Sequence, residues 1–441
     1  MTTPDAPAAD RRHDCVIVGC GPAGAMLGLL LARAGLDVLV LEKHGDFLRD
    51  FRGDTIHPAT LELLDQLGLA DRFLALPHAK VGRFGLAAGD TAITVDFARL
   101  PTKFPYIAFV PQWDFLDFVT GEARRYPGFR LVTNAEATGL VVEAGVVRGV
   151  RYRTADGEQV ALGRLTVGAD GRTSVTRAAA GLRPVEFGAP MDVFWFRLPR
   201  RPDEPTTVQA RAAPGRFGLM LNRGDQWQVG YLIPKGGAET VRAEGLEAFR
   251  AAVAALLPEL ADRVGDLRDW DQIRLLTVQS NRLRRWWAPG YLAIGDAAHA
   301  MSPIGGVGIN FAIQDAVEAA NVLWRPLRDG RVSTADLATV QRHREVPTRL
   351  IQGLQSLLQA QVVAPNISGA ADPGVGRPFR LALAAPFLRD LPARLIGLGV
   401  GRPRIASPEE PGAGDRGSGG RTAAQAWPPE SPSLCSPRMS G

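Results

Sequence analysis

The chain has 441 residues, of which 46% are hydrophobic and 22% charged, as in a globular protein that buries a sizeable core. Its net charge of +5 is small for this length, and its Lys and Arg residues are scattered, which argues against a nucleic-acid-binding surface. Three cysteines provide no disulfide framework, so we expect a reducing, cytoplasmic setting.

The beginning of the sequence predicts a βαβ unit. Residues 1–12 are polar and rich in Pro and Ala, so we expect a disordered leader there. The stretch DCVIVGCGPAGAMLGLLLARAGLDVLVLEK then contains two apolar strands without alternation, as in a parallel sheet covered on both faces. Glycines interrupt the apolar run between them, which favours a helix of this unit over a membrane span or a signal peptide.

A GxGxxG turn joins the first strand to the helix. Gly19 permits the tight turn, Gly21 lets the backbone approach a pyrophosphate, and Gly24 allows close packing of helix on strand. Glu42 ends the second strand, where an acidic residue accepts from ribose hydroxyls. The pattern favours an ADP moiety over a packing turn that binds nothing, and it does not distinguish FAD from NAD. The residues expected to hold this moiety are Gly19, Gly21, Pro22, Ala23, Gly24, Glu42 and Lys43.

Helices and strands continue through the next part of the chain. Helix signals cover 58–76 and 112–126, and a β-rich patch lies between them at 81–98. The strands near 139–168 alternate apolar and polar residues, and EAG and ADG are hairpin turns between them.

From about 185 to 280 the pattern changes to short strands with Trp, Phe and Pro/Gly turns, interrupted by a helix at 243–262. This predicts a separate antiparallel sheet. Alternation places Phe194 and Phe196 on one face of it and Trp195 on the other, so only one of these sets can line a pocket. Sheet core is the default role for such aromatics; the candidates for substrate binding are Phe194, Phe196, Met220 and Tyr231.

The C-terminal part returns to the first pattern. The apolar strand YLAIGD at 291–296 is followed by helices over about 307–328 and 335–363. The amphipathic segment 378–399 is interrupted by prolines, so we expect it to dock on the protein's own surface rather than on a membrane. Beyond about 404 the chain is dense in Pro, Gly and Ser, which predicts disorder.

A second glycine-rich motif follows the strand at 291–294. Asp296 lies at the carboxyl end of that strand, where open α/β sheets bind ligands, and can accept from a sugar or ribityl hydroxyl. Pro303 and the glycines after it enter a helix whose N-terminus brings partial positive charge to the same crevice. A reduced flavin carries negative charge that such a terminus stabilises, which favours FAD over NAD. The residues expected here are Gly295, Asp296, Pro303, Gly305, Gly306, Val307, Gly308, Ile309 and Asn310.

Three motifs together carry a resemblance to a known family: the GxGxxG turn, GADG at 168–171 and GDAAHAMSPIGGVGIN at 295–310. Over about residues 14–345 the sequence resembles the FAD-dependent aromatic hydroxylases of the para-hydroxybenzoate hydroxylase type, the single-component flavoprotein monooxygenases. The resemblance implies non-covalent FAD, reduction by NADPH or NADH, and addition of O2 at the flavin C4a. The resulting hydroperoxide hydroxylates an electron-rich aromatic ring.

The resemblance also implies roles for single residues. Asp170 and Gly171 match a DG motif that touches FAD and the nicotinamide cofactor, and Gln112 matches a glutamine on the ribityl chain. Arg52 matches the position that contacts the flavin side, and Pro303 a proline whose carbonyl lies close to the isoalloxazine and the substrate. Arg52 and Pro303 are therefore the candidate catalytic residues.

The predicted fold is α/β, a Rossmann-like FAD-binding domain with an inserted antiparallel substrate sheet and a helical C-terminal region. The predicted parts are a leader at 1–12, an FAD-binding domain at 13–80, 99–184 and 276–345, a substrate-binding sheet domain at 81–98 and 185–275, a helical region at 346–403 and a disordered tail at 404–441.

Several of these residues also have structural interpretations. Asp170 precedes a glycine and fits an ordinary Asp-Gly turn. We expect His299 and His57 to make structural hydrogen bonds, because hydroxylation needs a dry pocket and an electrophilic peroxide more than a protein base. No Cys/His cluster has metal-ligand spacing.

Other functions stay open at this point. A flavin-dependent halogenase would carry a WxWxIP segment and a lysine, whereas this chain has VFWFRLP, and Lys80 lies in no comparable context. A flavin-dependent double-bond reductase and a non-catalytic flavin-binding protein are further alternatives. The expected partners are an aromatic small molecule, NAD(P)H and O2; a polyketide-like substrate is favoured because no Arg/Tyr set resembles the carboxylate clamp of the small-benzoate enzymes. The oligomeric state is not predicted.

Overall fold

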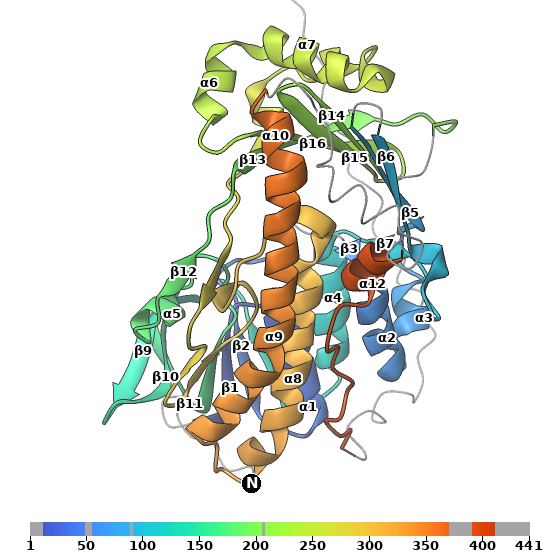
Figure 1. The fold of residues 1–441 in the computed structure, drawn as a ribbon. Helices are drawn as coiled ribbons and strands as arrows, with labels where there is room; N and C mark the ends of the chain where they lie inside the picture. Colours follow the sequence, from blue (N-terminus) through green and yellow to red (C-terminus); the bar gives the residue numbers. More distant parts are fainter. Residues whose placement is uncertain (1–11, 49–54, 89–90, 205–207, 370–389, 411–441) are drawn as a thin grey trace, which may run out of the picture.

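The predicted βαβ unit forms the centre of an eight-stranded sheet (Figure 1). The structure is a computed structural model that describes residues 12–48, 55–88, 91–204, 208–369 and 390–410. In the sheet, β1 (Arg12–Val18) is flanked by parallel β2 (Val38–Leu41) and β11 (Gly157–Gly168), in the order β19-β20-β11-β1-β2-β8. The other members are β8 (Phe129–Val132), β9 (Glu136–Glu143), β10 (Val146–Thr154), β19 (Trp287–Ala288) and β20 (Tyr291–Ala293), with β9 and β10 as an antiparallel hairpin extension of β11.

Helices cover this sheet. Helix α1 (Pro22–Arg33) begins with Pro at its first position and buries almost every side chain, because it packs on α4 (Gln112–Ala123) and α8 (Gly308–Arg328). Helix α9 (Thr334–Leu358) lies along α8 and continues through a π-helical turn, Gln359–Val363, into α10 (Ala364–Ile367) (Figure 1). The smaller helices are α2 (Pro58–Gln66), α3 (Ala70–Phe73) and α5 (Val175–Ala179).

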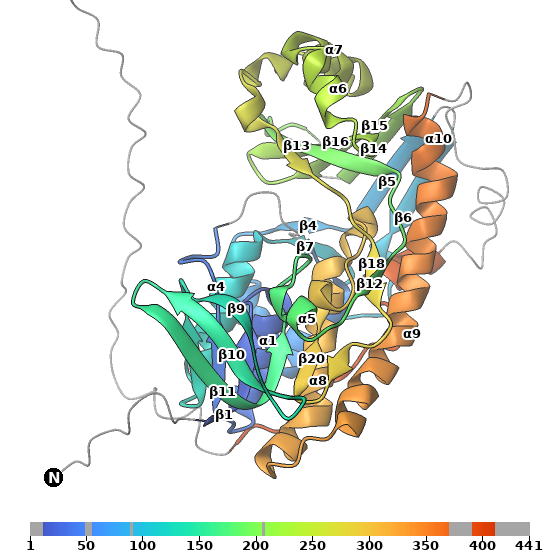
Figure 2. The ribbon, with the colours of Figure 1, turned by 90° about the vertical axis from the view of Figure 1, so that its left-hand side faces the viewer.

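A seven-stranded sheet lies above this part (Figures 1 and 2), in the order β17-β13-β16-β15-β14-β5-β6. All neighbouring strands are antiparallel except β14 and β5, which are parallel, so the expected antiparallel sheet contains one parallel pair. The strands are β5 (Arg83–Ala88), β6 (Thr91–Asp96), β13 (Met191–Pro199), β14 (Val208–Ala213), β15 (Arg216–Asn222), β16 (Gln226–Pro234) and β17 (Arg274–Leu276).

Two helices, α6 (Ala238–Ala243) and α7 (Leu246–Leu256), cover the outer face of the seven-stranded sheet, and its other face is turned toward the first sheet and α9 (Figures 1 and 2). The helix expected over 243–262 is α7, which is shorter than expected, and α6 before it was not predicted. Gly245, with a φ of 91°, separates the two helices. The connecting ribbons are β12 (Pro184–Glu186) with β18 (Asn281–Leu283), and β3 (Thr55–Ile56) with β7 (Ile107–Phe109) and β4 (Ala79–Val81).

The C-terminal described segment, residues 401–410, lies on the first part of the molecule. Arg33 donates to the Ser407 carbonyl at 3.1 Å and pairs with Glu409 at 3.1 Å, and the side chain of Asn321 accepts from the Ser407 amide at 3.1 Å. The predicted disorder from residue 404 onward is therefore wrong for 404–410, because these backbone groups find partners on α1 and α8. Of the amphipathic segment at 378–399, residues 378–389 lie outside the described residues and α12 covers Leu391–Gly397.

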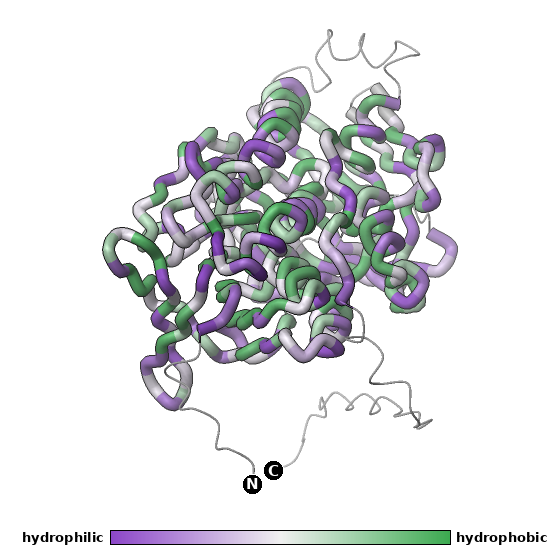
Figure 3. Tube along the Cα trace, turned by 90° about the horizontal axis from the view of Figure 1, so that it is seen from below, coloured by the Kyte–Doolittle hydropathy of each residue, from purple (hydrophilic) through white to green (hydrophobic). Residues whose placement is uncertain are grey.

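Within the described ranges, no helix combines the length and the apolar character needed to cross a bilayer. Seen from below, hydrophilic and hydrophobic residues are interspersed along the helices that face the viewer (Figure 3).

Candidate active site

The carboxyl ends of the parallel strands meet at one edge of the first sheet. Val18 pairs with Leu41 on one side and with Gly168 on the other, and Gly168 pairs with Ala293. The segments that follow these four residues are the GxGxxG turn, Glu42, the GADG motif and GDAAHAMSPIGGVGIN. Parallel pairing therefore brings all three sequence motifs to a single crevice, the position where open α/β sheets bind ligands.

The glycines of the GxGxxG turn differ in their surroundings. A Cβ on Gly19 would lie 2.5 Å from the Ala169 carbonyl oxygen, and a Cβ on Gly24 would lie 1.9 Å from the Gly19 carbonyl oxygen. Both are packing positions. A Cβ on Gly21 would meet nothing within 4 Å, and the helix that begins after Gly21 has no side-chain cap. Gly21 therefore presents the unpaired amides of a helix N-terminus to open space, an arrangement that suits a phosphate.

Gly295 brings the second glycine-rich motif against the first. A Cβ on this residue would lie 3.2 Å from Cβ of Ala23 in α1 and 3.3 Å from Cβ of Ala312 in α8. With a φ of 59°, Gly295 also has a backbone conformation that favours glycine. The close approach of the two helices at this point places their N-terminal turns in the same crevice.

Glu42 lies beside the GxGxxG turn. Its Oε2 accepts from the Cys20 amide at 2.9 Å and its Oε1 from the His44 amide at 3.1 Å. These bonds fix the carboxylate at the carboxyl end of β2, where it can accept from a ribose. The neighbouring Lys43 is exposed.

Asp296 is paired with Arg172, a residue that the sequence did not single out. Arg172 Nε donates to Asp296 Oδ2 at 3.1 Å, and Asp296 Oδ1 accepts no bond from the described residues. Arg177 crosses between the same segments, because its guanidinium donates to the carbonyls of Ala297 at 3.1 Å and Arg172 at 2.8 Å. The position of Arg172 directly after the Asp-Gly pair was the only available signal for it.

Asp170 serves as a local cap. It accepts from Ser174 Oγ at 2.5 Å, from the Thr176 amide at 3.0 Å and from Thr176 Oγ1 at 2.9 Å. Both carboxylate oxygens are thus used inside the turn that starts α5. The geometry supports the turn interpretation of Asp170, and its contact with cofactors remains a prediction.

The loop before α8 has a backbone that only glycine adopts easily. Gly305 and Gly306 have φ of 78° and 62°, and Pro303 accepts from the Gly306 amide at 3.0 Å. Helix α8 then begins at Gly308 without a side-chain cap. The predicted site residue Asn310 is buried, and its amide group bridges the loop to the Thr55–His57 segment through bonds to Thr55, Gly306, His57 and Thr60. The side chain of Asn310 therefore has a structural role.

A buried network of charged side chains contacts the second glycine-rich motif and fixes its backbone. His299 Nε2 lies 2.6 Å from Asp315 Oδ2, which also accepts from the Gly295 amide at 3.0 Å, and Arg344 Nε donates to Asp315 Oδ1 at 2.9 Å. Burial alone would raise the pKa of Asp315, but His299 and Arg344 lower it below its usual value. Because His299 is 1% exposed and engaged in this network, the structure agrees with a structural role for it.

For two predicted site residues, the structure adds little about the predicted role. Arg52 lies outside the described residues. Gln112 is the first residue of α4 and is half-buried.

The predicted substrate residues face the wrong side of their sheet. Phe194, Phe196, Met220 and Tyr231 are buried between the sheet and α7, where Phe249 packs edge-on against Phe194 at 5.8 Å and against Tyr231 at 5.4 Å between ring centroids. The opposite face, toward the first sheet, carries Trp195, Leu219 and Leu232, which share a cluster with Ile304 of the glycine loop. Alternation predicted the two sets correctly, but only the packing of α7 shows which set is covered.

The arrangement fits FAD. An open glycine at one helix N-terminus suits a pyrophosphate, Glu42 suits a ribose, and the free oxygen of Asp296 suits a ribityl hydroxyl. The uncapped N-terminus of α8 lies in the same crevice, and its partial positive charge can stabilise negative charge on the flavin ring.

Comparison with known proteins identifies the family of the chain. Residues 12–353 match the family described as an FAD binding domain. The chain is 34% identical over 377 residues to a 6-methylpretetramide 4-monooxygenase of Streptomyces rimosus, covering 84% of this chain and 90% of that protein. It is 31% identical over 325 residues to a 12-dehydrotetracycline 5-monooxygenase/anhydrotetracycline 6-monooxygenase of Streptomyces rimosus subsp. rimosus, covering 71% of this chain and 62% of the length of that relative.

Solved structures share the fold. A p-nitrophenol 4-monooxygenase from Pseudomonas putida has a TM-score of 0.72 at 19% identity, covering 88% of this chain and 99% of that one. A flavin-dependent brominase has a TM-score of 0.71 at 19% identity, covering 88% and 94%. At this level of identity the likeness concerns the fold alone.

Proposed function

The chain belongs to the FAD binding domain family and is an FAD-dependent monooxygenase, and we propose that it hydroxylates a phenolic, polyketide-like aromatic molecule at the expense of NAD(P)H. The observation that carries the proposal is the convergence of three motifs on one crevice, with two uncapped helix N-termini and the carboxylates of Glu42 and Asp296. FAD, when bound there, supplies electron transfer from the reductant to O2.

The residues of the chain hold and orient the cofactor. The N-terminus of α1 at Gly21 receives the pyrophosphate, Glu42 the adenosine ribose and Asp296 the ribityl chain. Arg172 holds Asp296 in place, and the network around Asp315 fixes the backbone of Gly295. Pro303 and the N-terminus of α8 would hold the flavin ring, and the resemblance adds Arg52 and Gln112 as further residues that would contact it.

An aromatic substrate fits the inner face of the seven-stranded sheet. This face is apolar, and a Cβ on Gly230 would lie 3.0 Å from the Trp195 ring, so the glycine leaves room for the indole to lie across the sheet. The indole Nε1 of Trp195 is buried and has no hydrogen-bond partner among the described residues. The names of the two Streptomyces relatives support a polycyclic substrate.

A halogenase shares the fold but is less well supported. The string in the chain that is nearest to a WxWxIP segment is VFWFRLP, and Lys80 lies on β4 with its ammonium 4.8 Å from the centroid of the Tyr106 ring.

The function is tested by assay of the purified protein. We expect a yellow protein that oxidises NADPH or NADH faster with a polycyclic phenol present and forms an oxygenated product. A product that depends on halide and carries no added oxygen would contradict the proposal, as would a protein without flavin.

The assignment of Asp296 has its own test. Asp296→Ala removes the acceptor for the ribityl hydroxyl and leaves Arg172 unpaired, so we expect FAD affinity to fall at least about tenfold. Flavin fluorescence monitors the dissociation of FAD from the variant and from the wild-type protein. Asp329→Ala, an exposed carboxylate at the end of α8, is the matched control. Equal retention of FAD in both variants would show that Asp296 is not a ligand.

A further inference from the structure

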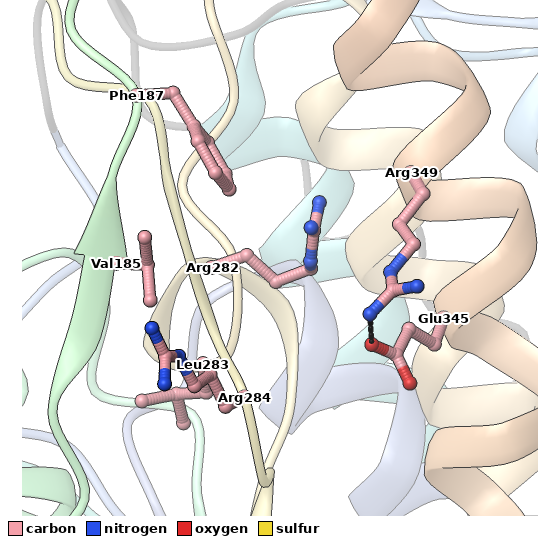
Figure 4. Close-up of a pocket in the computed structure, with 7 residues that line it drawn as sticks. All are labelled: Val185, Phe187, Arg282, Leu283, Arg284, Glu345 and Arg349. Atoms are coloured by element: carbon pink, nitrogen blue, oxygen red, sulfur yellow. Dashed lines mark ion pairs between the residues drawn. The ribbon is translucent and has the colours of Figure 1, made fainter.

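Outside the crevice, a surface pocket with a volume of about 360 Å³ lies between the β12–β18 ribbon and α9 (Figure 4). This volume is within the range of small-molecule sites, which starts at about 300 Å³. Arg282 lies in β18, Arg284 follows it and Arg349 lies in α9. All three line the pocket, with the Arg284 side chain on the side of Val185 (Figure 4).

The charges of the pocket are not balanced. Among the described residues that line the pocket, Glu345 is the only acidic one, and it pairs with Arg349 at 2.7 Å. Arg282 donates to Gln352 Oε1 at 2.6 Å, a neutral partner, and Arg284 is exposed without an ion-pair partner in the described part of the chain. Burial, together with the nearby Arg349, lowers the pKa of Arg282. An anion in the pocket would relieve this repulsion between guanidinium groups.

An aromatic ring completes the lining. Phe187 is 44% exposed, which is unusual for a large apolar side chain, and the Arg282 guanidinium lies 4.9 Å from its ring centroid. Guanidinium groups bind phosphate through paired hydrogen bonds, and an exposed aromatic face suits a purine ring. The chemistry of the pocket thus fits an adenine nucleotide that carries several phosphates.

The strand that lines the pocket is hydrogen-bonded to the loop of the second glycine-rich motif. In β18, the Leu283 amide donates to the Ala298 carbonyl at 2.8 Å and the Asn281 amide to the Ala300 carbonyl at 3.1 Å. Gln352, which holds Arg282, also donates to the Ala300 carbonyl at 3.1 Å. The pocket therefore shares a wall with the segment that runs from Asp296 to Pro303.

We propose that this pocket binds the phosphate groups of NADPH, the reductant that delivers electrons to the flavin. The inference rests on the proposed function, and it narrows the reductant to the phosphorylated dinucleotide. The arginines hold the phosphates, and Phe187 contacts the adenine.

Charge reversal tests the pocket. In the FAD-loaded protein, Arg284→Glu and Arg349→Glu are expected to weaken binding of NADP+ and of adenosine 2′,5′-bisphosphate at least about tenfold each by calorimetry, because each loses a charge-assisted bond. KM for NADPH should rise in parallel, with a smaller change for NADH and with FAD content and KM for the aromatic substrate unchanged. Arg153→Ala, an exposed arginine on β10, is the control and should change none of these values.

A second kind of variant is expected to bind the nucleotides more tightly, a result that misfolding cannot produce. Glu345→Gln removes the only carboxylate of the pocket while keeping its size, so we expect tighter binding of both nucleotides. Affinities within twofold of wild type in all three variants would overturn the inference, and so would a change confined to KM of the aromatic substrate. If the wild-type protein holds FAD and binds neither nucleotide, the pocket assignment is wrong even where NADH supports hydroxylation. A protein without flavin would contradict the proposed function, and calorimetry would still decide the pocket.

Discussion

At the scale of single residues, His57 shows how a histidine beside the crevice can be structural. Its ring is 1% exposed, and Nδ1 donates to the Ile396 carbonyl at 2.7 Å, so the neutral ring bridges the start of α2 to α12. Burial, partly offset by this bond, lowers the pKa of His57 from 6.5 to about 4. The folded protein therefore excludes a proton that the unfolded chain accepts.

This shift predicts an acid-sensitive contribution to stability. Between pH 6.5 and about 4, the unfolded chain binds a proton at His57 that the folded protein does not, so the free energy of unfolding should fall as the pH is lowered. The full loss at this residue is about 3 kcal/mol, since each pKa unit corresponds to about 1.4 kcal/mol. Urea unfolding of wild type and His57→Gln at pH 7 and pH 4.5 measures it. The variant should show a shallower pH dependence, and identical slopes would contradict the assignment.

Some residues of the crevice could be predicted from the sequence, and others could not. The spacing of Gly19, Gly21 and Gly24 is local, so the sequence alone indicates the turn. Arg172 acquires its role only when parallel strands bring it to Asp296, 124 positions away, which no local pattern encodes. For Trp195 and Phe194, alternation gives opposite faces, but the identity of the covered face depends on where α7 packs.

At the scale of elements, helix types were easier to predict than helix ends. The apolar periodicity at 58–76 indicated a helix, but the structure has α2 and α3 there, separated near Gly68 with a φ of 69°. A glycine also shortens the helix expected at 243–262, because Gly245 with a φ of 91° makes α7 begin at Leu246. An isolated glycine within a periodic stretch is tolerated in some helices and ends others, and the tertiary contacts decide which.

The turn into α1 yields a prediction with a matched pair of variants. In Gly24→Ala the new methyl group would lie 1.9 Å from the Gly19 carbonyl oxygen, so the FAD-free protein should lose several kcal/mol of stability. In Gly21→Ala the methyl group meets open space, so the stability of the FAD-free protein should change by less than about 1 kcal/mol.

The two variants should differ again in cofactor binding. Because its methyl group points where the pyrophosphate is expected, Gly21→Ala should still lower FAD affinity at least about tenfold. Urea unfolding of the FAD-free proteins and fluorescence titration with FAD separate the effects. Normal FAD affinity in Gly21→Ala would show that the phosphate lies elsewhere.

At the scale of the whole molecule, the segment at 401–410 connects helices that are far apart in the chain. Besides its bonds to Arg33 and Asn321, the Ile405 amide donates to Gln66 at 2.9 Å, and Arg402 pairs with Glu62 at 2.6 Å. The segment thus joins α1, α2 and α8 at the surface. Its composition gave no sign of these bonds, because they use backbone groups and single charged side chains and do not require an apolar pattern.

Truncation measures the contribution of this segment. Compared with a chain that ends after Glu410, a chain that ends after residue 403 loses the bonds to Arg33, Gln66 and Asn321, and we expect its melting temperature to be roughly 2–5 °C lower. Differential scanning calorimetry of the two chains checks this. Equal melting temperatures would mean that the segment is not held in solution.

The register of the first sheet has a consequence for how the protein is made. Val18 pairs with Gly168, which in turn pairs with Ala293, so the crevice closes only across two very long loops. The entropy of closing such loops grows only with the logarithm of their length, so the penalty falls mainly on the folding rate. On the ribosome, a chain that has not reached Ala293 presents only one half of the cofactor cradle. We therefore expect FAD to bind only after the chain beyond Ala293 has been made, so that an interrupted chain would not retain FAD.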